Sequence, residues 1–414
     1  MGKLTVSEIE LASKQLDGVA KNTALELNMS LSEKYQCEVY LKREDLQQVR
    51  SYKIRGAYNK ISSLTAEELA KGVICASAGN HAQGFAYSCN LLGIHGTIYM
   101  PSTTPKQKVA KVKFFGKDKV TVVLSGDTFD DSFKEAMALC QEKGMTFVHP
   151  FDDLKVMAGQ GTVGKEIDET LDQIDYLFLP VGGGGLFSGV GTYYQEKRPN
   201  TKLIAVEPEG APALKRALDE GQVVELAEID KFVDGAAVQQ VGKNTFEVIK
   251  ETLSDLILVP EGKVCSTILQ LYNEEAIVVE PAGALTIAAL DFYKEQIKGK
   301  RIVCVVSGSN NDIDRMGEIK ERSLMYEGLK HFFIVRFPQR PGALKEFVTK
   351  VLGPTDDITR FEFVKKNFRE SGPALIGIEL KQPEDYQGLI ERMNQYGINH
   401  TVINDDPSLF EYFV

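Results

Sequence analysis

The sequence lacks any run of apolar residues long enough to cross a membrane, for which roughly 18 consecutive apolar residues would be needed. Its opening stretch, MGKLTVSEIELASKQL, contains no apolar segment of signal-peptide length. Acidic side chains outnumber basic ones by 58 to 48, the net charge is −10, and no long basic run is present. We therefore expect a cytoplasmic protein that binds neither membranes nor nucleic acids.

Cysteine and histidine are too scattered to suggest a metal site. The six cysteines include no C-x-x-C pair and the five histidines show no ligand spacing, so no metal is predicted. Cys75 and Cys304 lie in apolar, strand-like runs. This placement favours buried thiols in a reducing compartment.

The chain has enough apolar material for more than one domain. With 414 residues, 43% hydrophobic and 26% charged, it has the composition of a globular protein of two or three domains. From about residue 38 to 320, short apolar strands alternate with helical patterns, which predicts an α/β fold with a mostly parallel sheet covered on both faces. Ligands of such sheets bind at the carboxyl ends of the strands, where the strand-to-helix turns lie.

After Lys330 the pattern changes to the order β-α-β-β-α-β, which predicts a ferredoxin-like module that ends in the strands HTVIND and LFEYFV. We place the domain boundary between residues 325 and 331, so that residues 1–325 and 331–414 form separate regions. The module needs its own hydrophobic core. We expect that core to consist of Phe332, Ile334, Phe361, Phe363, Ile376 and Ile378.

Two strand-to-helix turns have a composition suited to anions. In SAGNHAQG, which begins at Ser77, small residues let a ligand approach the backbone and the next helix offers free N–H groups. Ser77 and Asn80 could instead serve only as helix N-caps.

The second turn contains four consecutive glycines, Gly182 to Gly185, followed by Leu186. Each glycine lowers the stability of the folded chain by roughly 0.5–1 kcal/mol relative to alanine, because it loses more conformational entropy on folding. A ring of backbone N–H groups that binds a phosphate would explain why four glycines are kept here. The spacing matches neither a Walker loop nor the G-x-G-x-x-G dinucleotide pattern. The glycines predict that a phosphate group binds here, but they do not identify the ligand that carries it. A flexible turn is the alternative.

Two further turns carry single polar residues. VVSGSNND places Ser307 at the end of an apolar strand, where its hydroxyl could face a ligand as a neutral donor or acceptor. EPAGA opens a helix at Glu280, and the sequence leaves open whether that carboxylate points inward or outward.

Lys53 lies between Arg50 and Arg55 where a helix is predicted to begin. Positive neighbours and a helix N-terminus disfavour the ammonium form, so a neutral amine that attacks carbonyl groups is easier to reach. A solvated surface lysine is the alternative. A reactive lysine, a glycine-lined phosphate turn and a small-residue anion loop are together what a pyridoxal-phosphate enzyme requires.

Five segments, SYKIRGA, SAGNHAQG, GGGGL, EPAGA and SGSNND, occur in the order and spacing of the fold-type II pyridoxal-phosphate enzymes, whose catalytic region is tryptophan synthase β-like. Over essentially its whole length the chain resembles the biosynthetic threonine dehydratases (threonine ammonia-lyases), including one C-terminal ACT-like regulatory domain. The resemblance implies a lyase that contains pyridoxal 5'-phosphate and converts L-threonine to 2-oxobutanoate and ammonia in isoleucine biosynthesis. It also implies some activity on L-serine, allosteric control by isoleucine and valine, and a homotetramer.

The resemblance assigns roles to individual residues. Lys53 matches the lysine that carries the cofactor, Asn80 the asparagine at its phenolic oxygen, and Ser307 the serine beside its pyridine nitrogen. The phosphate loop is matched by Gly182, Gly183, Gly184, Gly185 and Leu186, and the substrate-carboxylate loop by Ser77, Ala78, Gly79 and His81.

Some features leave alternatives open. Ser309 stands where the family usually has glycine, and VDGAAV (233–238) resembles family sequence but has no assigned role. Another fold-type II enzyme, such as a serine dehydratase, serine racemase, cysteine synthase or threonine synthase, would use similar motifs. From a different class, the chain could be a non-catalytic amino-acid sensor, and the C-terminal module could serve only in assembly.

Overall fold

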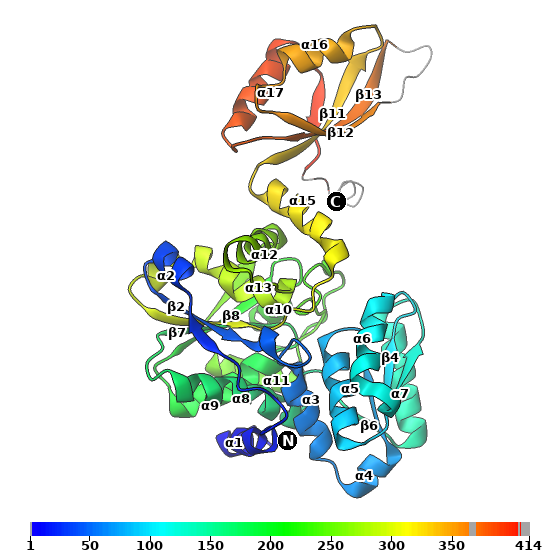
Figure 1. Ribbon diagram of the computed structural model, residues 1–414, viewed down its shortest axis with the longest axis vertical. Helices are drawn as coiled ribbons and strands as arrows, with labels where there is room; N and C mark the ends of the chain where they lie inside the picture. Colours follow the sequence, from blue (N-terminus) through cyan, green and yellow to red (C-terminus); the bar gives the residue numbers. More distant parts are fainter. Residues whose placement is uncertain (1, 364–369, 405, 407–414) are drawn as a thin grey trace. The chain divides into compact units, whose positions relative to one another are not determined.

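The computed structural model describes residues 2–363, 370–404 and 406. The chain forms two compact units (Figure 1). The first unit comprises Met1–Glu261 and Ala276–Asn311, and the second comprises Gly262–Glu275 and Asp312–Val414. Among the described residues, no helix is both long and apolar enough to span a membrane.

A six-stranded sheet of order β1-β2-β10-β7-β8-β9 forms the centre of the first unit. All its neighbouring strands run parallel except β1, which is antiparallel to β2. This arrangement confirms the predicted α/β fold with a mostly parallel sheet. The strands are Leu25–Leu27 (β1), Glu38–Arg43 (β2), Tyr176–Pro180 (β7), Lys202–Pro208 (β8), Asp255–Val259 (β9) and Arg301–Val306 (β10).

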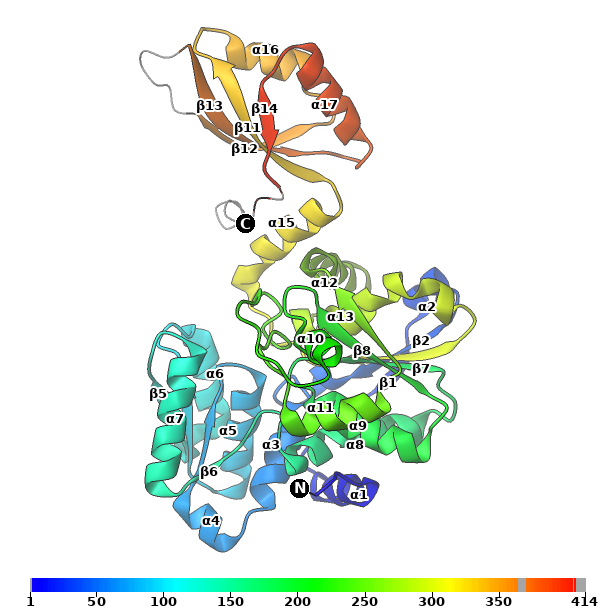
Figure 2. The same cartoon turned by 180° about the vertical axis from the view of Figure 1, so that it is seen from behind.

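A second, four-stranded parallel sheet of order β5-β4-β3-β6 belongs to the same unit (Figure 2). Alternate residues of β3 enter different cores: Val73 and Cys75 pack with helix α5, whereas Ile74 and Ala76 pack with helix α7. The sheet is therefore covered on both faces, as the continuous apolar strands predict. Its strands are Val73–Ala76 (β3), Gly96–Met100 (β4), Val120–Leu124 (β5) and Thr146–Phe147 (β6).

Helices surround both sheets of the first unit. They are Val6–Gln15 (α1), Met29–Tyr35 (α2), Lys53–Ser62 (α3), Ala66–Lys71 (α4), Asn80–Leu92 (α5), Lys106–Gly116 (α6), Phe129–Lys143 (α7), Leu154–Thr170 (α8), Gly185–Lys197 (α9), Ala213–Glu220 (α10), Lys243–Thr252 (α11), Pro281–Ala288 (α13) and Lys294–Ile297 (α14). Short 3-10 turns occur at Glu44–Leu46, Lys117–Lys119 and Ala289–Phe292.

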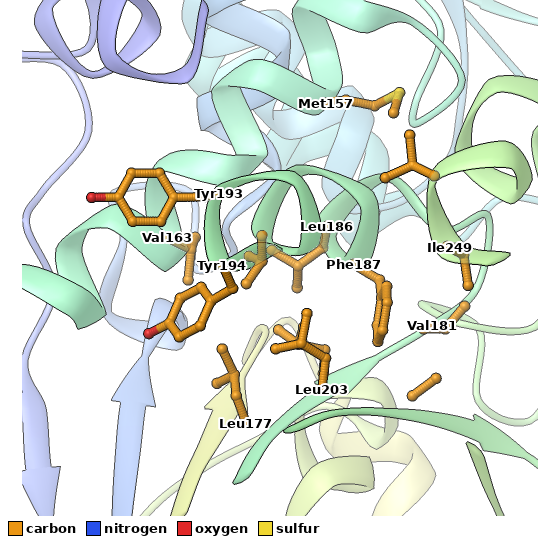
Figure 3. Packing of buried hydrophobic residues seen from close by; sticks show 14 of the residues in the cluster. Met157, Val163, Leu177, Val181, Leu186, Phe187, Tyr193, Tyr194, Leu203 and Ile249 are labelled. Carbon is orange, nitrogen blue, oxygen red and sulfur yellow. The ribbon is translucent and has the colours of Figure 1, made fainter. Parts of the chain in front are cut away.

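The main core lies between the six-stranded sheet and helices α8 and α9 (Figure 3). Figure 3 shows Leu186 and Phe187 of α9 beside Leu203 of β8 in this core. The two helices approach closely because both carry glycine at their contact: a Cβ on Gly161 would lie 2.8 Å from the carbonyl oxygen of Gly189. This packing fixes the position of the glycine turn that precedes α9.

The second unit contains a four-stranded antiparallel sheet of order β12-β13-β11-β14 with two helices in the chain order β-α-β-β-α-β. This confirms the predicted ferredoxin-like module. Its elements are Lys330–Pro338 (β11), Ala343–Lys350 (α16), Asp357–Phe363 (β12), Ser371–Glu379 (β13), Asp385–Gln395 (α17) and His400–Val402 (β14). Most of Glu261–Glu275 (α12), together with Ile313–Arg315 (a 3-10 turn) and Met316–Tyr326 (α15), also belongs to this unit.

The predicted core of this module needs correction. Ile376 and Ile378 are fully buried in it, with Phe363 packed against it. On β11 the core face is instead Phe333, Val335 and Phe337, one residue out of register with the prediction. Among the other expected core residues, Phe332 is buried outside that cluster, Ile334 is half-buried and Phe361 is 37% exposed. The predicted strand LFEYFV lies outside the described residues.

Candidate active site

Lys53 is the first residue of α3, and its amine is held inside the first unit. The Nζ atom donates a hydrogen bond to the Pro150 carbonyl at 3.0 Å and lies 5.3 Å from the centre of the Tyr52 ring. Burial lowers the pKa of Lys53 from 10.5 to about 8, although the nearby Glu280 carboxylate acts in the opposite direction. The neutral form of this amine is therefore far more populated near physiological pH than in an ordinary lysine.

The lowered pKa of Lys53 does not come from its arginine neighbours, so that part of the prediction is wrong. The side chain of Arg55 turns into a buried network with Glu44 and Glu166, at 2.8 and 2.6 Å. Arg50 contributes a backbone carbonyl, which accepts a hydrogen bond from the Ser309 N–H at 2.9 Å. Loss of water around the Lys53 amine is the dominant cause.

Asn80 and Glu280 are brought together from distant parts of the chain. The Nδ2 atom of Asn80 donates a hydrogen bond to Oε1 of Glu280 at 2.6 Å. The Glu280 carboxylate is buried and points inward, which answers the question that the sequence left open. Burial raises the pKa of Glu280 to about 7. Asn80 is the first residue of α5 and Gly79 is its N-cap, without a side-chain cap, so neither Ser77 nor Asn80 caps this helix.

The segment Ser77, Ala78 and Gly79 leads into α5 and is half-buried. The Ser77 hydroxyl accepts a hydrogen bond from the Gly79 N–H at 3.3 Å. The first N–H groups of α5 have no acceptor within the helix, so they are available to an anion. His81 differs from the rest because its ring is buried, with Nε2 bonded to the Val148 carbonyl at 2.9 Å; burial lowers its pKa to about 3.

The glycine turn has a wall formed by residues 150–160. A Cβ at Gly183 would collide with the ring of Phe151, and one at Gly185 would lie 2.5 Å from Oε1 of Gln160. Gln160 also donates from Nε2 to the Pro150 carbonyl, at 3.3 Å. The carbonyl that holds Lys53 is thus next to the residue that faces the glycines.

The other two glycines are equally confined. A Cβ at Gly182 would lie 2.8 Å from the carbonyl oxygen of Ala236, within the VDGAAV segment. Gly184 has φ +89°, a conformation that L side chains rarely adopt, and is the N-cap of α9. Leu186 is buried in the main core. The turn is therefore a fixed backbone structure at a helix N-terminus, with free N–H groups for a phosphate.

Ser307 follows β10 and is only 2% exposed. Its carbonyl accepts a hydrogen bond from the Tyr52 N–H at 3.2 Å. The Ser307 hydroxyl is a neutral donor, and such a donor suits an unprotonated ring nitrogen of a ligand. Ser309 is accommodated without difficulty, since its hydroxyl donates to the Asp45 carbonyl at 3.2 Å.

These features fit pyridoxal phosphate. The buried amine of Lys53 suits its aldehyde, the glycine turn before α9 suits its phosphate, and the neutral hydroxyl of Ser307 suits its ring nitrogen. All three lie in the first unit.

Several residues of the site carried no signal in the sequence analysis. Pro150 and Phe151 belong to the loop HPFDD, which is neither a strand end with small residues nor a periodic segment. The carboxylate of Asp152 accepts from the N–H groups at the start of α11, including Asn244 at 2.8 Å. Thr245 in turn donates to the Gly183 carbonyl at 2.7 Å. One loop therefore supports both Lys53 and the glycine turn.

Comparisons with known proteins agree with this geometry. Residues 16–308 match the family described as pyridoxal-phosphate dependent enzyme, and residues 321–413 match the C-terminal regulatory domain of threonine dehydratase. The chain is 60% identical to the L-threonine dehydratase biosynthetic IlvA of Halalkalibacterium halodurans, with 100% of both chains covered. It is 57% identical to the protein of the same name from Bacillus subtilis, covering 99% of this chain and 98% of that one.

Several solved structures have related folds, and some of them are at least 30% identical to this chain. The processed form of threonine deaminase isoform 2 from Solanum lycopersicum has a TM-score of 0.72 and 40% identity, covering 78% of this chain and 96% of that one. Serine racemase from Dictyostelium discoideum has a TM-score of 0.70 and 32% identity, covering 75% of this chain and all of the other. Both are similar to this chain in fold and in sequence.

Proposed function

The chain belongs to the family of pyridoxal-phosphate-dependent enzymes, and from this membership we propose that it is a lyase converting L-threonine to 2-oxobutanoate and ammonia. Relatives named biosynthetic threonine dehydratase match it over essentially their full lengths. The observation that carries the proposal is the buried amine of Lys53, which is shielded from water and lies next to a rigid glycine turn. Some activity on L-serine follows from its chemistry, because serine presents the same β-hydroxyl without the methyl group.

The residues that would hold the cofactor are Lys53 at its aldehyde, Asn80 at its phenolic oxygen and Ser307 at its ring nitrogen, with Gly182, Gly183, Gly184, Gly185 and Leu186 at its phosphate. When bound, pyridoxal phosphate supplies an electrophilic carbon and a conjugated ring that withdraws electrons from Cα of an attached amino acid. The first turn of α5, with Ser77, Ala78, Gly79 and His81, would bind the substrate carboxylate through backbone N–H groups.

Lys53 would act twice. Its neutral Nζ would hold the cofactor at its aldehyde, and the same atom would also accept the proton from Cα of the substrate. The serine hydroxyl at the ring nitrogen is uncharged, in contrast to a carboxylate, and so does not hold a proton there. An uncharged hydroxyl at that position would favour elimination of the β-hydroxyl over side reactions at Cα.

The remaining features of the proposal concern regulation and assembly. We assign residues 1–325 to catalysis and residues 331–414 to an ACT-like regulatory domain that binds isoleucine or valine. We also propose a cytoplasmic homotetramer. The regulatory assignment is supported by the match of residues 321–413 to a regulatory domain of threonine dehydratase.

The test compares Lys53→Ala with Lys71→Ala, a change at an exposed lysine that pairs with Glu67 one turn away. Wild-type protein and Lys71→Ala should absorb visible light when loaded with pyridoxal phosphate and form 2-oxobutanoate from threonine. Lys53→Ala should lose both properties and keep the thermal unfolding midpoint of the unloaded chain. A Lys53→Ala protein that still consumes threonine would end the proposal.

A further inference from the structure

Glu280 lies in the centre of the site, yet the proposed mechanism gives it no role. It is the N-cap residue of α13 and is 5% exposed, but its side chain makes no cap hydrogen bond. Instead Oε1 accepts from Nδ2 of Asn80 at 2.6 Å and Oε2 accepts from the Asn310 N–H at 3.2 Å. A buried carboxylate held by donors from two distant segments is an arrangement that capping does not explain.

The backbone around Glu280 leaves space for this direction of the side chain. A Cβ on Gly308 would collide with Oε1 of Glu280, whereas a Cβ on Gly235 would collide with Cβ of Ala282 at 2.7 Å. Gly235 belongs to the VDGAAV segment, whose Ala236 also borders Gly182. The absence of a side chain at Gly308 thus permits the Glu280 carboxylate to point into the site.

The hydrogen bonds determine which way the Asn80 amide faces. An ionised Glu280 can only accept, so Asn80 must present its NH₂ group to it. At the other end, Oδ1 of Asn80 accepts from Nδ2 of Asn310 at 2.7 Å, and Nδ2 of Asn310 also donates to the Val49 carbonyl at 2.8 Å. Both ends of the Asn80 amide are therefore specified, and one Nδ2 hydrogen is left over.

The same network reaches helix α6. Lys111 donates to Oδ1 of Asn310 at 3.4 Å, and Lys108 pairs with Asp234 of the VDGAAV segment at 3.0 Å. Charged groups facing Glu280 therefore include Asp234, which raises its pKa, and Lys108, which lowers it. Burial has the largest effect and leaves the pKa of Glu280 at about 7.

We propose that Glu280 is a positioning residue: its carboxylate fixes the side-chain amide of Asn80 so that the remaining Nδ2 hydrogen points to the cofactor's phenolic oxygen. This inference rests on the proposed function. Glu280 does not touch the cofactor in this scheme and acts through Asn80. Its contribution to cofactor affinity should then disappear when Asn80 is absent.

The experiment is a double-mutant cycle on the affinity of the unloaded chain for pyridoxal phosphate, measured by absorbance titration. The variants are Asn80→Ala, Glu280→Ala and the combination, with Glu209→Gln as a control that removes an exposed carboxylate from the same unit. Asn80→Ala should weaken binding about tenfold, roughly the effect of one hydrogen bond to a charged group. Glu280→Ala should come close to this loss, and the combined variant should bind no worse than Asn80→Ala.

Other outcomes have clear meanings. If the losses of the two single variants add, Glu280 acts independently of Asn80 and the inference is overturned. Wild-type protein that binds no cofactor would overturn the proposed function as well, whereas additive losses in a functional enzyme overturn only the inference.

Thermal unfolding of the unloaded variants checks that they fold. If Glu280→Ala does not fold, Glu280→Gln takes its place in the cycle, because it keeps the shape and only one of the two acceptor oxygens. It should then shift the visible absorption maximum of the loaded enzyme in the same direction as Asn80→Ala. Loss of thermal stability without weaker binding or a spectral shift would mean a purely structural role.

Discussion

The amine of Lys53 and the side-chain amide of Gln160 donate to the same acceptor, the carbonyl oxygen of Pro150, at 3.0 and 3.3 Å. Gln160 is completely buried, and its own Oε1 has no hydrogen-bond partner among the described residues. The Lys53 amine thus has one shared carbonyl and little water to stabilise its charge. An ammonium group with so few partners loses its proton easily.

The first prediction concerns the rate at which the unloaded chain takes up pyridoxal phosphate. Only the neutral amine attacks the aldehyde, and burial lowers the pKa of Lys53 to about 8. The rate should therefore rise with pH, reach half its maximum near pH 8 and level off above it, as followed by stopped-flow absorbance. Lys53→Ala should show no such phase. A rate that continues to rise to about pH 10.4, the value of an ordinary lysine, would contradict the assignment.

The second prediction concerns the wall of the glycine turn. Gly183→Ala would place a methyl group against the Phe151 ring, so the turn or the ring must move. Overpacking of this kind costs about 1–3 kcal/mol, and we expect weaker pyridoxal-phosphate binding together with a lower unfolding midpoint. Adding Phe151→Ala should recover part of the affinity by making room.

Gly317→Ala is the matched control for this change. Gly317 lies in helix α15, its added Cβ would contact nothing within 4 Å, and its φ is not positive. Alanine is the better helix former, so this variant should bind cofactor normally and be at least as stable as wild type. Equal cofactor affinity for Gly183→Ala and Gly317→Ala would show that the turn does not need glycine at 183.

The third prediction concerns the buried ion pairs around Arg55, in the same helix as Lys53. Arg55 pairs with Glu44 and Glu166, and Lys42 also pairs with Glu166 at 2.6 Å. Arg55→Leu leaves Glu44 buried without its cation, which should lower the free energy of unfolding by about 3–5 kcal/mol, as measured by urea denaturation. Lys71→Leu, at an exposed pair, should change it by about 1 kcal/mol at most.

The pH dependence of that loss has a definite sign. Burial alone would raise the pKa of Glu44, but the Arg55 guanidinium, helped by Lys42 and the Thr23 hydroxyl, outweighs it and the net pKa is lowered. Stability from this pair is therefore present above the unfolded pKa of the carboxyl and is lost as pH falls through the folded one. The difference between wild type and Arg55→Leu should shrink in acid. A difference that grows in acid would contradict this account.

Much of this site was predictable from sequence because its anchors follow strands or begin helices. Lys53, Asn80, the glycine turn and Ser307 all lie in such places, and the structure brings them into one unit. The reason given for the lowered pKa of Lys53 was wrong, since sequence neighbours on a helix need not face one another. Burial depends on segments about a hundred residues away, such as Pro150, which no local pattern reveals.

The core of the second unit shows a different limit. The strand KHFFIVRFP is apolar at consecutive positions, so alternation does not identify the face that carries the core. A shift of one residue exchanges Phe332 and Ile334 for Phe333 and Val335. Only pairing with β13, where Phe333 is opposite Ile376, settles the register.

The last prediction tests the regulatory role proposed for the second unit. An effector changes the affinity for substrate only if it binds one state of the protein better than another. L-Isoleucine added to a threonine titration should raise the half-saturation concentration severalfold, and L-isoleucine binding should be detectable by calorimetry. D-Isoleucine, which has the same apolar surface with inverted Cα geometry, should do neither. No shift with L-isoleucine and no heat of binding would leave the second unit with a structural role only, because a domain that does not bind the effector has no free energy with which to bias the active site.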